Sequence, residues 1–390
     1  MQEGILKKLS ECTWADQAKI DWANLLFLLL LHIGGLTLSL FYFFYFGLNF
    51  GVLALALAFY LISGLGITVG YHRLVAHQTF KVPPVVEFLL LLAGGMAIQN
   101  SALKWCYDHR LHHKFEDNVD DPYNINRGFW YAHMGWIIRT PNPKNFPHLK
   151  KDLLANPLVV FQDKHYWALA ILSSLALPTY LGYLIGDAVG GFVVAGVLRI
   201  VIVHHFTFFI NSLCHIWGRQ PYSDKVTAKD NAVLAFFTYG EGYHNFHHKF
   251  QHDYRNGIKW YQFDPSKWVI QILSFFKLAT SLKRASHLSI LKAQLTMRQK
   301  EIRQRIDLLS HRKDLNQRID DLIKKVEQAY RDMREKKLIY QERLHKFKLE
   351  KTEQAKQELK ILKAEWQAAK WEYKMLYRQW QMYSVALAEA

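Results

Sequence analysis

Long apolar stretches dominate the first part of the chain. Four of them are each long enough to cross about 30 Å of hydrocarbon as a helix. They cover residues 23–44, 50–69, 166–185 and 189–210. Tyrosine and tryptophan residues stand near their ends, which is typical of helices that end at a membrane interface. The pattern therefore predicts an all-α integral membrane protein with four transmembrane helices.

The distribution of charge predicts the direction of these crossings. The short connections within the two pairs of spans, residues 45–49 and 186–188, contain no Lys or Arg. The basic loops all fall on the opposite side, which the positive-inside rule assigns to the cytoplasm. Because four crossings return the chain to its starting side, we expect a multi-pass protein with both termini and the active site on the cytoplasmic side.

A fifth apolar stretch, residues 82–96, is shorter than the other four. Pro83 and Pro84 stand near its beginning, and Gly94 and Gly95 stand near its end. This length and these helix breakers favour a helix that lies in the membrane interface or dips into it. Histidine clusters before and after the stretch then stay on one side of the membrane.

The composition changes near residue 280. Residues 281–390 contain neither Pro nor Gly and carry a net charge of +11, against +5 for the rest of the chain. We therefore divide the chain into a cytosolic N-terminal segment (1–21), a transmembrane domain (22–280) and a basic helical, coiled-coil-like tail (281–390).

Apolar residues from Leu362 to Tyr383 recur at alternating spacings of four and three, which is the pattern of a coiled coil. A solvated helix gains nothing from exposing such a stripe, so we expect a partner surface. The alternatives are self-association into a homo-oligomer, docking of an electron donor or an acyl carrier, a helix on anionic lipid, and a plain solvated helix. Basic and acidic residues interleave along the tail, which argues against nucleic acid as a partner.

Nine of the 19 histidines fall in tight clusters. They are His72 and His77, then His109, His112 and His113, then His215, and then His244, His247 and His248. Residues three and four apart share a helix face, so each of the two His-x-x-His-His motifs can point its rings the same way. His72 and His77 would lie about 140° apart on an ideal α-helix. On a regular helix that pair is poorly placed to bind one ion together. It is better placed to bind two neighbouring ions, or the helix unwinds at this end.

Nine imidazoles are too many ligands for one ion and fit two. Imidazole without thiolate suits Fe, Zn, Cu or Ni. No carboxylate falls at a ligand spacing within the clusters. Glu241 is expected to support a histidine ring from behind, and Asp120-Asp121-Pro122 to cap a turn. The isolated histidines, His32, His133, His148, His165, His204 and His205, are interpreted as hydrogen-bonded polar groups at the interface.

An all-nitrogen site for two metals beside a membrane favours redox chemistry on a long-chain substrate, because hydrolytic two-metal sites usually also recruit bridging carboxylates. Two other functions stay open on this reasoning. A membrane hydroxylase of the alkane or sterol type would use similar chemistry and yield an alcohol. A metal-binding transporter would need charged or histidine residues deep within several spans.

Five segments resemble successive signatures of the acyl-CoA (stearoyl-CoA type) delta-9 desaturases, in the same order. They are HRLVAH (72–77), DHRLHHKFEDNVDDPYN (108–124), NRGFWYAHMGW (126–136), NSLCHIWG (211–218) and GEGYHNFHHKF (240–250). The resemblance covers about residues 22–275. It implies four transmembrane helices under a cytosolic histidine-rich cap, with a long fatty acyl chain in a kinked tunnel.

The resemblance also implies the cofactors and partners. The nine clustered histidines match the ligands of two iron ions, and Asn211 matches a residue that holds a water next to one iron. O₂ is the oxidant. The chain contains no His-Pro-Gly-Gly haem motif, so electrons are expected from a separate donor of the ferredoxin, cytochrome b5 or reductase type.

The expected contacts to the substrate head group are Asn100, Asp108 and Arg139. Asn100 and Asp108 match the family pattern, whereas Tyr107 stands where animal enzymes have an arginine. Arg139 comes one residue earlier than the family's Arg-Lys pair. Fewer cations near a phosphate-rich head group weaken the assignment of acyl-CoA, so acyl carrier protein and lipid-bound acyl chains stay open as substrates.

Overall fold

The computed structural model of the protein describes residues 19–139, 146–306, 312–350 and 352–389. The chain divides into two compact units, one made of the residues up to Gln220 with 224–284, and one made of 221–223 with 285–390. The described residues form helices and isolated β-bridges, with no β-strand. The predicted boundary was residue 280; the main division falls between Arg284 and Ala285. The predicted N-terminal segment lies mostly outside the described residues.

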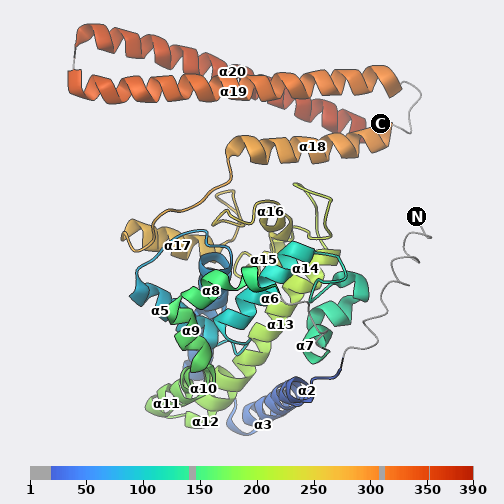
Figure 1. Ribbon diagram of the computed structural model, residues 1–390, viewed down its shortest axis with the longest axis vertical. Helices are drawn as coiled ribbons and strands as arrows, with labels where there is room; N and C mark the ends of the chain where they lie inside the picture. Colours follow the sequence, from blue (N-terminus) through green and yellow to red (C-terminus); the bar gives the residue numbers. More distant parts are fainter. Residues whose placement is uncertain (1–18, 140–145, 307–311, 351, 390) are drawn as a thin grey trace. The chain divides into compact units, whose positions relative to one another are not determined.

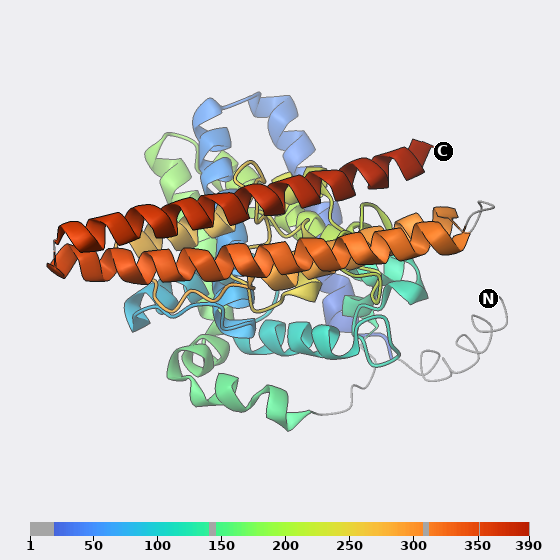
Figure 2. The same ribbon diagram turned by 90° about the horizontal axis from the view of Figure 1, so that it is seen from above.

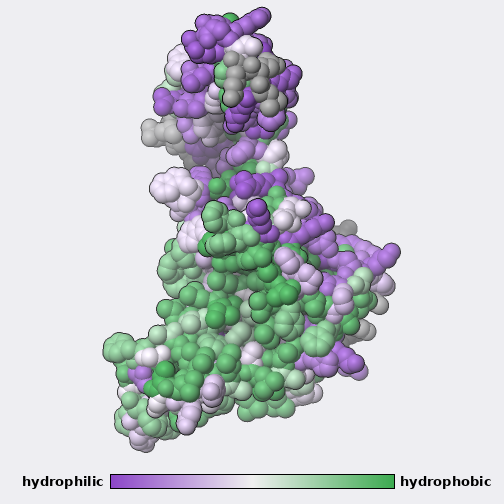
Figure 3. All heavy atoms as spheres, turned by 90° about the vertical axis from the view of Figure 1, so that its left-hand side faces the viewer, coloured by the Kyte–Doolittle hydropathy of each residue, from purple (hydrophilic) through white to green (hydrophobic). Residues whose placement is uncertain are grey.

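Four helices of the first unit are long and apolar enough to span a membrane, which confirms the predicted all-α membrane fold (Figure 1). They are Trp22–Phe46, Phe50–Ala76, Tyr166–Leu184 and Ala188–Ile216. Hydrophobic side chains cover this unit over much of the face shown in Figure 3. Phe44 and Phe50, at the first connection, are 80% and 81% exposed. Continuous apolar surface of this kind fits contact with lipid.

The spans include wide π-helical turns, which are labelled η together with the 3₁₀ turns. The spans consist of α2 (Trp22–Leu29), η2 (Leu30–Gly34) and α3 (Gly35–Phe46), then α4 (Phe50–Leu65) and η3 (Gly66–Ala76), then α10 (Tyr166–Ile171), η7 (Leu172–Ala176) and α11 (Leu177–Leu184), and then α12 (Ala188–Gly190), η8 (Gly191–Leu198), α13 (Arg199–Asn211) and α14 (Leu213–Ile216). The other elements of this unit are α5 (Pro84–Gly95), α6 (Ala102–Phe115), η4 (Ile125–Arg127), η5 (Tyr131–Gly135), α7 (Trp136–Ile138), η6 (Pro147–Leu149), α8 (Lys151–Ala155), α9 (Pro157–Lys164), α15 (Ala232–Phe237), α16 (His244–Lys249) and α17 (Pro265–Phe275).

Polar side chains set where several of these helices begin. Asn49 accepts hydrogen bonds from the backbone N–H groups of Gly51 and Val52 at the start of α4. Ser101 caps α6 and Asp264 caps α17 in the same way. These caps satisfy backbone donors that have no partner inside a helix. The cap of α6 matters most for the site, because α6 carries three clustered histidines.

The fifth apolar stretch forms the short helix α5, which is 12 residues long and is not among the span-length helices. It packs very closely on η3. A Cβ atom at Gly66 would lie only 2.2 Å from the backbone nitrogen of Gly94, so only glycine permits this approach. The contact fixes the segment that carries His72 against α5.

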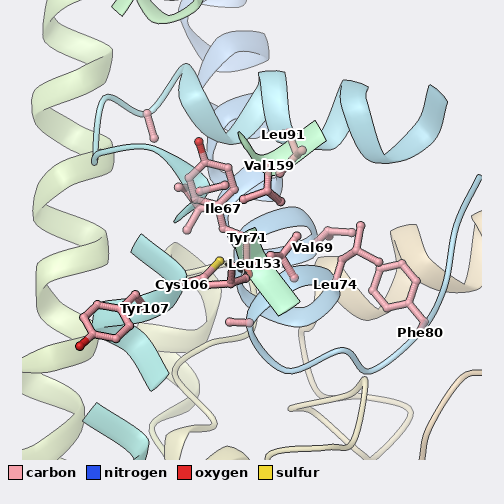
Figure 4. Close-up of a cluster of buried hydrophobic side chains, with 14 of the residues drawn as sticks. Ile67, Val69, Tyr71, Leu74, Phe80, Leu91, Cys106, Tyr107, Leu153 and Val159 are labelled. Carbon is pink, nitrogen blue, oxygen red and sulfur yellow. Dashed lines mark hydrogen bonds between the residues drawn. The ribbon is translucent and has the colours of Figure 1, made fainter. Parts of the chain in front are cut away.

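A buried apolar cluster holds the first two histidine motifs in place (Figure 4). Tyr71 of η3, Leu91 of α5, Cys106 of α6 and Val159 of α9 are all fully buried in it. Full burial of one large apolar side chain contributes about 1.5–3 kcal/mol. Four elements that are separate in the sequence are therefore packed into one rigid support for the site.

The second unit contains α18 (His287–Ile306), α19 (Arg312–Glu350) and α20 (Glu353–Glu389). α19 and α20 run side by side in opposite directions (Figure 2). The ring centres of Tyr330 and Tyr373 are 5.3 Å apart, and Nε of Arg343 lies 2.6 Å from Oε2 of Glu358. The tail is thus an antiparallel hairpin with α18 packed beside it.

The stripe from Leu362 to Tyr383 is not the surface for another molecule that we expected, whereas self-association through the tail stays a prediction. Most of the stripe from Leu362 to Tyr383 is covered by the chain's own helices. Ala369 is 4% exposed and Trp380 is 6% exposed, and Trp380 packs in one cluster with Leu295 of α18 and Val326 of α19. The stripe needs no other molecule, because α19 folds back onto it.

Candidate metal centre

The nine clustered histidines meet in the first unit as two groups. The first group is His72, His77, His109, His113 and His247, and the second is His112, His215, His244 and His248. In each group the available ligand atoms lie within 4.8 Å of one another. The rings come from η3, α6, α14 and α16, which the fold brings together. Two neighbouring groups, rather than one large one, fit a pair of metal ions.

Each His-x-x-His-His motif is shared between the two groups. On α6, His109 and His113 belong to the first group and His112 to the second. On α16, His244 and His248 belong to the second group and His247 to the first. On an α-helix the side chain at i+4 lies nearly above the one at i, while the side chain at i+3 is rotated to the other side of it. The motif therefore supplies both groups at once, which is more specific than the shared direction we expected.

The prediction that His72 and His77 are poorly placed to bind one ion is wrong. Both belong to the first group, and their ring centres are 4.8 Å apart. The reason is η3, whose turn is wider than that of an α-helix. The backbone N–H of His77 donates to the carbonyl of His72, five residues earlier, at 3.0 Å. Residues five apart share a face in a π-helix.

The Nε2 atoms of the rings point at one another. In the first group they are 3.0 Å apart between His72 and His247, and 2.8 Å apart between His77 and His109. In the second group they are 3.2 Å apart between His215 and His244. Facing nitrogen atoms in a buried space are able to hold a metal ion, and divalent transition metals bind imidazole nitrogen well.

The opposite ring nitrogens, Nδ1, face buried carboxylates. Nδ1 of His72 lies 2.9 Å from Glu241, Nδ1 of His112 lies 2.9 Å from Asp121, and Nδ1 of His248 lies 2.6 Å from Glu116. A carboxylate at Nδ1 holds the proton there and leaves the Nε2 lone pair for a metal.

Sequence reasoning found part of this outer layer. Glu241 lies behind a histidine ring, as expected. Asp121 accepts from the backbone N–H of Asp117 and Tyr123, as a turn cap does, and it also supports His112. Glu116 was given no role in advance, although it stands three residues after His113, just past the end of α6.

A hydroxyl relay behind His215 was also missed. Nδ1 of His215 lies 2.7 Å from Oγ1 of Thr227, and this hydroxyl donates to Oδ1 of Asp117 at 2.7 Å. Asp117 and Thr227 are separated by 110 residues, so no local motif could have indicated the contact.

Burial keeps most of these rings neutral. It lowers the pKa of His77, His109, His113, His244, His247 and His248 well below the ordinary value, and the neighbouring histidines lower it further. Burial also lowers the pKa of His112, but Asp121 more than offsets this and the net direction is upward. Burial raises the pKa of Glu241, yet His72 and Arg73 bring it down to about 2. Burial raises the pKa of Glu116, behind His248, to about 8. Neutral imidazoles are the state that binds metal, and behind His72 the supporting carboxylate of Glu241 is ionised.

A cavity runs along both groups. His72 and His109 of the first group line it, as do His112 and His244 of the second. Its walls are mostly apolar and aromatic, with residues such as Phe27, Ile67, Trp105, Trp136, Phe206 and Ile210. An apolar cavity with a few polar groups suits a long hydrocarbon chain.

Three of the four other predicted site residues line this cavity. They are Asn100, Asp108 and Asn211. Arg139 does not: its side chain is exposed and its backbone forms an isolated bridge with Ile20. The expected role of Arg139 at the cavity is therefore not supported by its position.

Two lysines stand near Asp108, where the sequence lacks the expected arginine. The ammonium group of Lys104 contacts the carboxylate of Asp108. Nζ of Lys150 lies 4.0 Å from the ring centre of Tyr107. The positive charge missing from position 107 is thus supplied by neighbouring side chains.

Four of the isolated histidines gather away from the two groups. Nε2 of His133 lies 3.1 Å from Nδ1 of His205, Nε2 of His204 donates to the carbonyl of Ala97 at 2.9 Å, and Nδ1 of His32 donates to the carbonyl of Leu28 at 2.7 Å. Each ring therefore has a hydrogen bond, as expected. The other ring nitrogens of His32 and His204 are buried without a partner, so the expectation holds only in part.

Comparison with known proteins decides the family. The family model described as fatty acid desaturase matches residues 48–271, more than half of the chain. The chain belongs to the fatty acid desaturase family. This confirms the resemblance seen in the histidine motifs, all of which fall inside the matched range.

Several individual desaturases are similar to this chain. The probable acyl-CoA desaturase of Schizosaccharomyces pombe is 43% identical over 250 residues, which is 64% of this chain and 52% of that protein. Acyl-CoA desaturase 1 of Saccharomyces cerevisiae is 40% identical over 257 residues, 65% of this chain and 50% of that protein. The sn-1 stearoyl-lipid 9-desaturase of Anabaena variabilis is 38% identical over 274 residues, 70% of this chain and 97% of that protein. The chain thus spans about half the length of the two yeast relatives and nearly all of the third.

Proposed function

We propose that the protein is an O₂-dependent fatty acyl desaturase that introduces a cis double bond at the delta-9 position of a long saturated chain. The observation that carries this proposal is the pair of histidine groups opening onto one apolar cavity. The names of the relatives support the reaction, and those of the third relative and of a Caenorhabditis elegans relative, the Delta(9)-fatty-acid desaturase fat-7, support the position.

The nine histidines fit two iron ions. Their Nε2 atoms converge, and buried carboxylates and a hydroxyl stand behind several of the rings. Bound iron would supply oxygen activation and the removal of hydrogen from an unactivated C–H bond. The protein's own part is to hold the chain beside both groups, with Asn211 at the cavity wall close to the second, and to exclude water through burial. O₂ is reduced to water with one electron pair from the acyl chain and one from a separate donor.

The metal content tests this assignment. Purified protein from iron-replete cells should contain about two iron ions per chain, because nine imidazoles exceed what one six-coordinate ion can bind. Elemental analysis together with protein quantification measures the ratio. A ratio near one in a fully active preparation would contradict the two-ion site.

For the head group we propose acyl-CoA. The structural support is the pair of lysines near Asp108, a residue that lines the cavity, because Lys104 and Lys150 could pair with phosphates there. Changing both to Gln should raise the KM for acyl-CoA roughly ten-fold and leave kcat little changed, since two exposed ion pairs contribute about this much in total. The matched control is Lys277→Gln, which changes an exposed lysine elsewhere in the first unit. Unchanged KM in the double variant, with faster use of a lipid-linked acyl chain, would instead identify a lipid as the substrate.

We further propose that the histidine groups face the cytoplasm. Single cysteines at Asn118 and Lys249 should then react with an impermeant thiol reagent from the cytoplasmic side only. A cysteine at Leu48, which is 68% exposed in the first connection, should react from the other side only. Labelling of Asn118→Cys and Lys249→Cys from opposite sides would make α5 a true span and separate the histidines.

The product tests the reaction itself. Cells that lack unsaturated fatty acids should gain cis-monounsaturated chains when they express this protein, and mass spectrometry with double-bond localisation gives the position. Hydroxylated chains in place of alkenes would favour the membrane hydroxylase. If the iron-loaded protein, supplied with a working electron donor, leaves the lipids unchanged, the proposed desaturase activity is wrong.

A further inference from the structure

Helix α20 carries a second apolar stripe that the chain does not cover. Its members are Ile361, Ala364, Ala368, Trp371, Met375 and Met382, with Arg378 at the remaining position. All are exposed, and Ile361, Trp371 and Met382 are 60%, 65% and 66% exposed. The spacings alternate between three and four residues throughout, which is the repeat of a coiled-coil seam.

The stripe lies on the far side of α20 from the hairpin contact. At 3.6 residues per turn, it is centred about 150° from the buried stripe that contains Ala369 and Trp380. The helices α18 and α19, which cover the buried stripe, therefore cannot reach it. The exposed stripe is only two positions wide per heptad. A seam this narrow is typical of a helix that pairs with another helix, whereas a helix that lies in lipid has a broader apolar face.

Charged residues flank this stripe with opposite signs. Lys360 and Lys374 lie along one edge, and Glu365 and Glu372 lie along the other. Among the described residues, none of these four side chains forms an ion pair within the chain. A membrane surface is a poor partner, because anionic lipid would repel the glutamate edge.

We propose that α20 pairs with α20 of a second copy of this chain, in parallel and in register. In a parallel pair, a residue at one edge meets the residue five positions later at the other edge of the partner helix. Lys360 then faces Glu365 of the second copy, and Gln367 faces Glu372. An antiparallel pair would set lysine edge against lysine edge and glutamate edge against glutamate edge. The charge pattern thus selects both the occupant and its direction.

Cysteine cross-linking in the full-length protein tests the pairing, because a parallel pair brings each stripe residue opposite its own copy. Ile361→Cys, Met375→Cys and Met382→Cys, each alone in a Cys12→Ser background, should each give a disulfide-linked dimer in native membranes. Cys106 and Cys214 are buried. Lys363→Cys, exposed but off the stripe, is the control and should stay monomeric. If cross-links form only when Ile361→Cys chains are mixed with Met382→Cys chains, the pair is antiparallel. If no cross-links form, a lipid or another protein covers the stripe. Either result overturns the proposal.

A charge exchange provides an independent test. Glu365→Lys should lower the dimer affinity roughly two- to five-fold for each Lys360–Glu365 pair lost, as measured by single-molecule photobleaching over a range of protein densities in liposomes. Adding Lys360→Glu to the same chain should restore it. Failure of the second change to restore dimerisation would overturn the parallel register. The result does not depend on the proposed function, because iron content and desaturation should remain those of the unchanged chain in every variant.

Discussion

Replacing His112 or His247 with Ala is expected to abolish desaturation while the protein still folds and inserts. His112 belongs to the second histidine group and His247 to the first, so each change breaks a different proposed iron site. Loss of a supporting residue behind a ligand typically costs 10–100-fold, so loss of a ligand itself should exceed about 100-fold. The measurement is the rate of desaturation per folded protein, together with iron content.

The control for this experiment is His148→Ala. His148 is exposed, and its Nε2 atom lies 3.0 Å from Nζ of Lys114, away from both groups. Its loss should leave most of the activity. Asp121→Asn, which weakens the support of His112 and the turn that Asp121 caps but removes no ring, should fall between these extremes. Equal losses at His112, His247 and His148, with normal iron content, would show that the histidines act in folding and would leave the chemistry unassigned.

The spans could be predicted from the sequence because the apolar stretches are long and almost free of charged residues. The site residues could be located along the chain because histidine clusters are rare, but their partition between two groups could not be predicted. The joining of His72 and His77 in one group depends on η3, a π-helix, whereas periodicity analysis assumes 3.6 residues per turn. The supporting groups Glu116, Asp117 and Thr227 were missed because tertiary packing, rather than spacing, brings them to the rings.

The reversal between α19 and α20 shows a different limit. The tail lacks Pro and Gly, so no strong turn signal marks the reversal. Two weak signals are present: residues 347–362 do not keep one heptad register, and the hydroxyl oxygen of Thr352 accepts from the backbone N–H of Ala355 at the start of α20. The apolar stripe correctly indicated a need for a partner. That the partner is α19 of the same chain could be learned only from the structure.

Arg73→Met is expected to destabilise the first unit strongly, even though the residue binds no metal. Its side chain is 1% exposed and connects two buried carboxylates. Nη2 of Arg73 lies 2.8 Å from Glu241, and Nη1 donates to Asp264 at 3.2 Å and to the carbonyl of Tyr254 at 2.8 Å. Removing the cation leaves two buried carboxylates with hydrogen bonds but without the arginine that balances their charge.

Breaking such a buried ion pair costs about 3–5 kcal/mol, a large part of the 5–15 kcal/mol by which proteins are stable. Glu241 also holds Nδ1 of His72, and Asp264 caps α17, so the change should loosen both the first histidine group and the packing of α17. Thermal unfolding of the purified protein in detergent measures the loss. Asp152→Asn, which breaks a half-exposed pair with Arg110, is the matched control and should cost less than about 1 kcal/mol. A similar small loss for Arg73→Met would mean that the two carboxylates take up protons or reach water when the arginine is gone, and that Arg73 does not organise this side of the site.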